Sequence, residues 1–429
     1  MDSSREIRPV RRPIDRRIRL PGSKSLTNRA LVAAALADGP STLSGALFAD
    51  DTRLMIDALA ALGVETKADP QREKILVSGC NGHWPECEAD VYCGNAGTVI
   101  RFLTAACAAG RGRYLFDGDA RMRQRPIGDL VRALVELGAA VAFAGAQNYP
   151  PVSVQPGSLR GGAVRIERPV SSQFISAILM AAPLAAQDVM IEVVGELPSR
   201  PYVRMTIEVM RAFGVSVIDD ELRRFIVPAG QPYRRADYEI EPDASTASYC
   251  FAAAALTGGR VTVEGLGGES IQGDGGFVDV LEKMGCTVQR GPRELTVRGP
   301  ADGRLRGVDV DLSDMPDVAQ TLAVVAAFAD GPTRIRHVAN LRVKETDRLH
   351  ALSRELCKIG TATEIHEDGL TIRPDATPRP SAIKTYNDHR MAMSFALAGL
   401  RLDGIVIEGS ACVSKTFPGF FELWDSLAD

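Results

Sequence analysis

Two alternating patterns of apolar and polar residues run along the chain. In the first, a helix-length stretch of small and apolar residues is followed by a glycine and then a short β-rich run. Ala33-Ala34-Ala35, Gly39 and Thr42-Leu43 form one example. The pattern occurs six times, around residues 33–35, 104–106, 178–180, 252–254, 324–326 and 395–397. Because small side chains allow helices and sheets to approach closely, these helices are predicted to form the cores, with sheets covering them.

The second pattern is an amphipathic helix that ends at a glycine and is followed by a strand. Its closing glycines lie 71 to 76 residues apart and are Gly63, Gly138, Gly214, Gly285 and Gly360. A sixth such helix, around residues 420–424, runs into the C-terminus. The two patterns therefore define a unit of about 72 residues that is used six times.

The repeat predicts an α/β (α+β) fold with two lobes of three units each. We expect residues 22–241 to form one lobe, and residues 1–21 with 242–429 to form the other. The chain would then cross between the lobes near Leu20–Gly22 and again near Glu239–Asp243. The sixth unit lacks its final strands, so the N-terminal run Arg12–Leu20 is predicted to complete it.

Composition narrows the class of protein. The chain has 429 residues, is 45% hydrophobic and carries a formal net charge of −4. No apolar run is long enough to span a bilayer, and the charged start lacks the apolar segment of a signal peptide. The Arg-rich run 8–19 partly alternates with apolar residues, which favours a strand over a nucleic-acid-binding arm. We expect a cytoplasmic protein, a monomer with neither nucleic-acid nor membrane partners.

The eight cysteines are scattered, and the one cluster is Cys80, His83, Cys87 and Cys93. Paired C-x2-C ligands are missing from it. The sequence therefore predicts reduced thiols and no metal site there.

A polar cluster precedes each small-residue helix, at residues 22–25, 94–98, 170–173, 243–246, 315–317 and 386–390. Ser, Asn, Asp and Gly are preferred helix N-caps, so capping explains part of this. Capping does not require Lys24, Arg101, Gln173, His389 or Arg390. Since helix N-termini attract anions, these clusters predict binding of small substrates with several negative charges. Charged loops flanked by proline and apolar residues, at 121–126, 199–202, 340–348 and 413–418, are predicted to contribute.

Eight motifs together resemble the 5-enolpyruvylshikimate-3-phosphate (EPSP) synthase family. Among them are L-P-G-S-K-S at 20–25, G-N-A-G-T at 94–98, S-S-Q-F at 171–174 and S-R-P-Y at 199–202. Others are N-L-R-V-K-E-T-D-R at 340–348, Y-N-D-H-R-M-A-M at 386–393 and K-T-F-P at 415–418, and an Arg-rich run at 121–127 is the eighth. They occur in the family's order over almost the whole chain. The family's two-lobed fold of six repeats matches the one that the repeat predicts.

The resemblance implies transfer of the enolpyruvyl group of phosphoenolpyruvate to the 5-hydroxyl of shikimate 3-phosphate, with release of phosphate, in aromatic amino acid biosynthesis. It implies no metal or redox cofactor. Asp317 would take the hydroxyl proton, and Glu345 would exchange protons with the methylene carbon. Lys24 and Lys415 would complete the catalytic set.

The resemblance also implies two sets of substrate-binding residues. Those for shikimate 3-phosphate are Ser25, Arg29, Ser171, Ser172, Ser199, Tyr202, Asn340 and Lys344. Those for phosphoenolpyruvate are Lys24, Gly97, Arg125, Gln173, Arg348, Arg390 and Lys415. Asn95, Thr98, Asp317 and His389 belong to the substrate site as well.

One residue departs from the family's pattern, and other functions compete with this one. Phe102 stands where the family often has a small residue or proline, so it is expected to pack behind the phosphoenolpyruvate pocket, next to Gly97 and Thr98. Gly97 itself fits the pattern of glyphosate-sensitive members, so the sequence does not decide the response to glyphosate. A sister enzyme that transfers enolpyruvyl to UDP-N-acetylglucosamine is the nearest alternative, although its K-N-G start and loop cysteine are not matched. A non-catalytic anion-binding homologue is the other alternative. A P-loop is excluded, because Gly22-Ser23-Lys24-Ser25 lacks the G-x-x-x-x-G-K-[ST] spacing.

Overall fold

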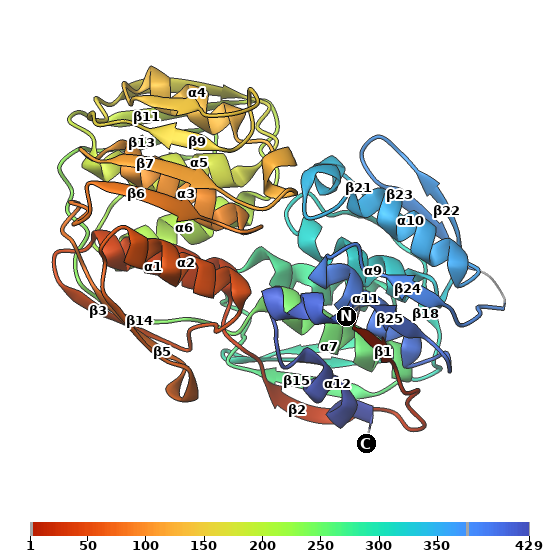
Figure 1. The fold of residues 1–429 in the computed structure, drawn as a ribbon. Helices are drawn as coiled ribbons and strands as arrows, with labels where there is room; N and C mark the ends of the chain where they lie inside the picture. The colour runs from red at the N-terminus through yellow and green to blue at the C-terminus, as the bar shows by residue number, and fades with distance from the viewer. Residues whose placement is uncertain (1–2, 375–376, 429) are drawn as a thin grey trace. The chain divides into compact units, whose positions relative to one another are not determined.

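The computed structural model describes residues 3–374 and 377–428. The chain divides into two compact units (Figure 1). Residues 22–240 form the continuous unit, and residues 1–21 with 241–429 form the split unit. Each unit is described by itself.

Three helices form the core of the continuous unit: α1 (Lys24–Leu36), α3 (Gly97–Ala108) and α5 (Ser172–Ala181). Every residue of α3 is buried, and α1 is buried from Leu26 onward. The small side chains predicted from the sequence allow this, because α3 can then pack directly against both α1 and α5. The amphipathic helices of this unit are α2 (Asp50–Ala61), α4 (Gly128–Glu136) and α6 (Arg200–Ala212).

The split unit repeats this plan. Its core helices are α7 (Ala244–Thr257), α9 (Ala319–Ala326) and α11 (His389–Gly399), and α11 packs against the other two. Its amphipathic helices are α8 (Phe277–Lys283), α10 (Arg348–Lys358) and α12 (Phe420–Ala428).

The closing glycines have the backbone that the repeat requires. The φ angles of Gly63, Gly138, Gly214, Gly285 and Gly360 lie between 81° and 109°. Residues with a Cβ rarely adopt this left-handed region, so glycine ends each amphipathic helix at little cost. The α/β fold of repeated helix and strand units is confirmed.

Three four-stranded sheets cover the continuous unit, in the orders β14-β3-β5-β4, β6-β7-β9-β8 and β10-β11-β13-β12. Their strands are β3 (Pro40–Ser44), β4 (Thr66–Asp69), β5 (Lys74–Ser78), β6 (Glu88–Tyr92), β7 (Arg113–Asp117), β8 (Val141–Phe143), β9 (Val152–Val154), β10 (Gly162–Glu167), β11 (Val189–Val194), β12 (Ile218–Asp220), β13 (Arg224–Val227) and β14 (Asp237–Glu239).

The split unit has sheets in the orders β16-β17-β15-β2, β19-β21-β23-β22 and β1-β25-β24, and a pair β18-β20. Their strands are β1 (Ser4–Glu6), β2 (Asp15–Arg19), β15 (Arg260–Glu264), β16 (Thr287–Arg290), β17 (Glu294–Arg298), β18 (Leu305–Arg306), β19 (Asp309–Asp311), β20 (Ala329–Asp330), β21 (Thr333–Arg336), β22 (Ala362–Ile365), β23 (Leu370–Arg373), β24 (Ala382–Lys384) and β25 (Val406–Glu408).

The predicted pairing of the N-terminal run is wrong. Arg12–Leu20 was expected to complete the sixth unit, but β2 pairs in parallel with β15 in the sheet of the fourth unit. The sixth sheet is completed by β1, which pairs antiparallel with β25 and places Arg5 opposite Ile407. Ser4–Glu6 is polar throughout, so its pairing depends on backbone hydrogen bonds. The segment therefore shows no alternation of apolar and polar residues by which a strand could be recognised in the sequence.

Candidate active site

The polar clusters lie at the N-termini of the core helices. Ser23 caps α1 and Ser171 caps α5, each through its side-chain oxygen. Asp243 and Asp388 cap α7 and α11 in the same way. These four caps satisfy backbone N–H groups at the helix starts, as the sequence predicts.

In the continuous unit, Lys24 forms an ion pair with Asp51 of α2, with 3.2 Å between Nζ and Oδ2. The Asp51 carboxylate is almost completely buried, whereas the Lys24 side chain is 15% exposed. One turn further on, the side-chain amide of Asn28 donates to Thr98 Oγ1 at 2.7 Å and joins α1 to the start of α3. The second turn of α1 and the first turn of α3 are therefore fixed to each other.

Gly97 lies among three polar side chains. A Cβ at this position would be 2.8 Å from Arg125 Nη2, 2.9 Å from Arg101 Nη1 and 3.2 Å from Gln173 Oε1. Arg101 donates to Gln173 Oε1 at 2.5 Å, and Arg125 donates to the carbonyl oxygen of Asn95 at 2.9 Å. Two guanidinium groups thus lie beside the N-terminus of α3, and glycine leaves space next to them. This arrangement suits a phosphate or carboxylate group.

Arg29, a predicted ligand of shikimate 3-phosphate, is almost completely buried by protein groups. It is 1% exposed and donates to Thr206 Oγ1 at 2.7 Å and to the carbonyl oxygens of Ser25 and Tyr202 at 2.9 and 3.0 Å. The ring of Phe102 lies 5.1 Å below its guanidinium carbon. Burial lowers the pKa of Arg29 to about 10. Arg29 therefore joins α1 to α6, and its contact with a substrate stays a prediction.

The predicted serines of this unit lie at helix starts. Ser172 is the first residue of α5, and Ser199 precedes α6 in a left-handed conformation, with φ 57° and ψ 44°. Both are buried. Pro201 in the first turn of α6 fixes the backbone that follows.

In the split unit, three carboxylates surround Arg348, the first residue of α10. Its Nε donates to Asp388 Oδ2 at 2.8 Å, its Nη1 to Asp317 Oδ1 at 3.0 Å and its Nη2 to Glu345 Oε2 at 2.9 Å. Burial alone disfavours the charged guanidinium, but the carboxylates of Asp388, Glu345 and Asp317 outweigh it and raise the pKa of Arg348 above its ordinary value. The fork of Arg348 thus fixes two of the predicted catalytic residues, Asp317 and Glu345, on neighbouring nitrogens.

Asp317 lies in the 3₁₀ turn Pro316–Val318, directly before α9. In addition to Arg348, its carboxylate contacts Arg390 Nη2 at 2.9 Å and Lys344 Nζ at 3.6 Å. Its side chain is 15% exposed, so solvent reaches it. Three cationic side chains therefore converge on one accessible carboxylate.

Arg390, in the first turn of α11, has further partners on α7. Its Nη2 donates to Ser245 Oγ at 3.3 Å and its Nη1 to the Tyr249 hydroxyl at 3.5 Å. The Ser245 hydroxyl donates in turn to the buried carboxylate of Asp274. Burial and the nearby Asp317 raise the pKa of Asp274 to about 6, against the opposing effects of Arg390 and the Ser245 hydrogen bond.

The remaining predicted residues of this unit lie next to the same helices. His389 is the buried first residue of α11, with Nδ1 3.7 Å from Asp388 Oδ1. Lys415 ends the 3₁₀ segment Ser410–Lys415, which packs against α11. Asn340 belongs to the segment Ala339–Val343, which packs against α10.

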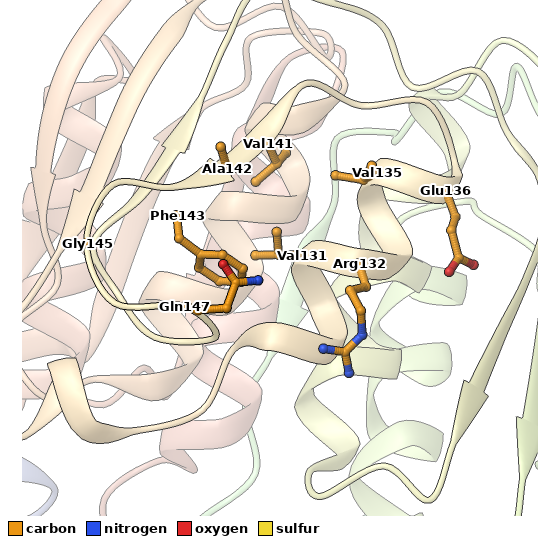
Figure 2. A pocket seen from close by; sticks show the side chains of 9 residues that line it. All are labelled: Val131, Arg132, Val135, Glu136, Val141, Ala142, Phe143, Gly145 and Gln147. Atoms are coloured by element: carbon orange, nitrogen blue, oxygen red, sulfur yellow. The ribbon is translucent and has the colours of Figure 1, made fainter.

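A pocket of about 480 Å³ lies elsewhere, beside α4 and β8 in the continuous unit (Figure 2). Phe143, Val131 and Val135 form much of its lining, together with Arg132 and Glu136. None of the predicted site residues lines it.

Within residues 3–374 and 377–428, no group of three His, Cys, Asp or Glu side chains is arranged to hold a metal ion. Among the described helices, none has both the length and the apolar character needed to cross a membrane.

The family model for EPSP synthase (3-phosphoshikimate 1-carboxyvinyltransferase) matches residues 10–424. The chain belongs to the EPSP synthase family. It is 46% identical over 424 residues to the 3-phosphoshikimate 1-carboxyvinyltransferase of Sulfurovum sp. (strain NBC37-1), covering 98% of each chain. The chloroplastic enzyme of Brassica napus is 47% identical over 436 residues, covering 98% of this chain and 84% of that one. The resemblance inferred from the motifs is confirmed.

Solved structures of EPSP synthases have the same fold. One from Acinetobacter baumannii superimposes with a TM-score of 0.84 at 27% identity, covering 100% of this chain and 98% of that one. Membership of the EPSP synthase family makes the chain a transferase.

Several residues that contact the predicted site residues are missing from the set that the sequence predicts. Arg101 and Asp388 belong to motifs that the sequence singles out, but they were not placed in the site. Asp51, Ser245 and Asp274 were missed as well. An Asp near a helix start is an ordinary N-terminal residue, so the sequence around Asp51 and Asp274 carries no distinguishing signal.

Proposed function

We propose that the chain transfers the enolpyruvyl group of phosphoenolpyruvate to the 5-hydroxyl of shikimate 3-phosphate. The observation that carries this proposal is the pair of carboxylates, Asp317 and Glu345, that Arg348 holds at 3.0 and 2.9 Å within a cluster of cations. An addition–elimination reaction between two anionic substrates requires these elements: cations for the anions and two groups that move protons. Family membership supplies the identity of the substrates.

In the first step, Asp317 accepts the 5-hydroxyl proton while the hydroxyl oxygen forms a bond to C2 of phosphoenolpyruvate. The electron pair of the C2–C3 double bond takes a proton from Glu345, which enters the reaction as the carboxylic acid, and the product is a tetrahedral ketal. In the second step the C2–O bond to phosphate breaks, and the departing phosphate takes up the proton that Asp317 accepted. A proton leaves the C3 methyl group for Glu345 as the double bond re-forms. Phosphate and the enolpyruvyl ether are the products, and neither step needs an external oxidant or reductant.

The substrate carboxylate is assigned to Arg348 and Arg390, since guanidinium forks suit carboxylates. Arg390 contacts Asp317 in the structure described here, so a bound carboxylate would draw Arg390 from it. The phosphate of phosphoenolpyruvate is assigned to Lys24, Arg125 and Lys415. The other proposed ligands are Gly97 and Gln173 for phosphoenolpyruvate, and Ser25, Arg29, Ser171, Ser172, Ser199, Tyr202, Asn340 and Lys344 for shikimate 3-phosphate. Asn95, Thr98 and His389 are proposed to contribute to substrate binding as well.

Phosphate release from phosphoenolpyruvate tests the proposal, with shikimate 3-phosphate or UDP-N-acetylglucosamine as the acceptor. We expect turnover with the first acceptor alone. Release with the UDP-sugar instead would favour the sister activity, which the comparisons do not support. Binding of both substrates without any release would indicate a non-catalytic homologue.

The protein is proposed to act as a cytoplasmic monomer, and light scattering coupled to size exclusion would measure its mass in solution.

Lys24→Ala and Lys415→Ala are each expected to lower kcat/KM for phosphoenolpyruvate by about 30- to 1000-fold. The reason is the loss of a cation worth about 2–4 kcal/mol to the transferring phosphate in the transition state. Lys67→Ala is the matched control, because Lys67 is exposed and pairs only weakly with Glu65 at 3.3 Å. Steady-state phosphate release gives the rates. A rate within twofold of the parent for either variant would remove that lysine from the site.

Gly97→Ala is expected to raise KM for phosphoenolpyruvate by about 10-fold, with little change in KM for shikimate 3-phosphate. The new methyl group would lie 2.8 Å from Arg125 Nη2 and 2.9 Å from Arg101 Nη1, so both guanidinium groups must shift. Gly157→Ala adds the same methyl group where the nearest atom is 3.7 Å away, and serves as the control. Equal KM values in the two variants would contradict the placement of the anion beside Gly97.

A further inference from the structure

Asp274 is a buried carboxylate to which the mechanism above gives no role. It lies in the 3₁₀ turn Gly273–Gly276, which packs against α7 and α8, and it is 3% exposed. The Ser245 hydroxyl donates its hydrogen to Asp274 Oδ2. With its hydrogen directed there, Ser245 Oγ presents its lone pairs to the Arg390 guanidinium, whose Nη2 donates to it at 3.3 Å.

The charged groups that face Asp274 come from three elements. Arg390 on α11 attracts its charge, whereas Asp317 before α9 and Asp243 at the start of α7 repel it. On α8, Asp279 accepts a hydrogen bond from Arg290 at the surface. A continuous series of contacts therefore runs from Asp274 through Ser245 and Arg390 to Asp317.

We propose that Asp274 is a positioning residue for the transfer reaction, which holds Arg390 through Ser245 in the orientation that receives the carboxylate of phosphoenolpyruvate. This inference rests on the proposed function. Two physical effects support it. The negative charge of Asp274 attracts the guanidinium, and the one-way hydrogen bond from Ser245 leaves the serine oxygen able to accept from Arg390. A neutral side chain at 274 loses the charge, and one that donates to Ser245 would turn the hydroxyl hydrogen towards the guanidinium.

The charge of the Asp274 side chain depends on pH. Burial raises the pKa of Asp274 to about 6 from 3.8, so the carboxylate is charged above that pH and neutral below it. Asp274→Asn imitates the neutral form at every pH. The ratio of wild-type to variant kcat/KM for phosphoenolpyruvate should therefore be high at pH 8 and fall as the pH drops through about 6. Titration of the substrates' own phosphates cancels in this ratio.

The test compares wild type and Asp274→Asn by phosphate release between pH 5 and pH 8. At pH 8 we expect KM for phosphoenolpyruvate to rise by about 10-fold, the usual effect of a hydrogen bond to a charged group, and KM for shikimate 3-phosphate to stay within twofold. Asp279→Asn, an exposed Asp nearby, should match the wild type. A ratio that does not change with pH, or equal rises in both KM values, would reduce Asp274 to a structural residue and overturn the proposal.

Two further measurements separate the possible failures. Wild-type protein without turnover would contradict the proposed function, whereas active wild type with an equally active Asp274→Asn variant would contradict this inference alone. Should the Asn variant fail to fold, Ser245→Ala keeps the Asp274 carboxylate and breaks its link to Arg390. A normal KM for phosphoenolpyruvate in that variant would also overturn the proposal.

Without any substrate, the melting temperature of wild type should fall relative to Asp274→Asn as pH rises from about 4 to 6. This sign follows because a raised carboxyl pKa stabilises the fold below the unfolded value and loses that contribution as pH passes the folded one.

Discussion

Asp317→Asn is expected to lower kcat by about 10²- to 10⁴-fold, the usual range for loss of a positioned base, while shikimate 3-phosphate still binds. The amide cannot accept the 5-hydroxyl proton. It also places an NH₂ group against the donors of Arg348 and Arg390, which approach the two carboxylate oxygens at 3.0 and 2.9 Å. Ketal formation should fail, because the attacking oxygen keeps its proton. Single-turnover phosphate release measures the chemical step, and calorimetry measures binding of shikimate 3-phosphate.

The control for Asp317→Asn is Asp309→Asn in the same unit. Asp309 is exposed and pairs with Arg336 at 2.6 Å, so its loss should change kcat by less than twofold. A kcat for Asp317→Asn within about 10-fold of the parent would exclude Asp317 as the base. Loss of shikimate 3-phosphate binding together with a lower melting temperature would instead make the ion pairs of Asp317 its main contribution.

The repeated plan of the fold could be predicted because it depends on local physical chemistry. Gly63 and Gly360 end their helices with φ angles of 83° and 93°, and this conformation is one that glycine alone adopts readily. The core helices could be recognised because their apolar residues leave no polar face, and α3 is buried along its whole length. Such signals lie within a dozen residues of one another, so a single sequence contains them.

Strand partners were harder to predict because they depend on distant segments. β2 directly precedes the first unit but joins the sheet of the fourth, and β14 directly precedes α7 but pairs with β3 of the first. β2 and β14 thus exchange places at the two points where the chain passes between the continuous unit and the split unit. Polar strands such as β1 have no apolar face, and only the backbone ladder fixes their partners.

The predicted site residues follow the same division. Motifs bring Lys344, Glu345 and Arg348 together because Lys344 and Glu345 lie in the short segment that leads directly into α10, which begins at Arg348. The structure adds that Asp317 contacts Arg348 and Lys344 from the start of the same repeat, 31 residues before Arg348 in sequence. The enclosure of Arg29 by Thr206 could not be predicted, because the contact joins residues that are 177 positions apart. Long-range contacts of this kind decide whether a cation within a motif faces a substrate or supports the helices behind it.

Glu345→Gln is expected to separate proton transfer at carbon from proton removal at oxygen. Glu345 is nearly buried and accepts a hydrogen bond from Arg348 Nη2 at 2.9 Å, so a glutamine can keep the shape and the contact through its carbonyl oxygen. It cannot give or take a proton at the methylene carbon, and kcat should fall by about 10²- to 10⁴-fold. The distinguishing measurement is incorporation of solvent deuterium into the methylene group of phosphoenolpyruvate, which requires reversible protonation of C3. Glu364→Gln, at an exposed position paired with Arg373 at 3.5 Å, is the matched control. If Glu345→Gln incorporates deuterium as fast as the parent, Glu345 is not the proton donor to carbon, and the role passes to another group such as Lys24.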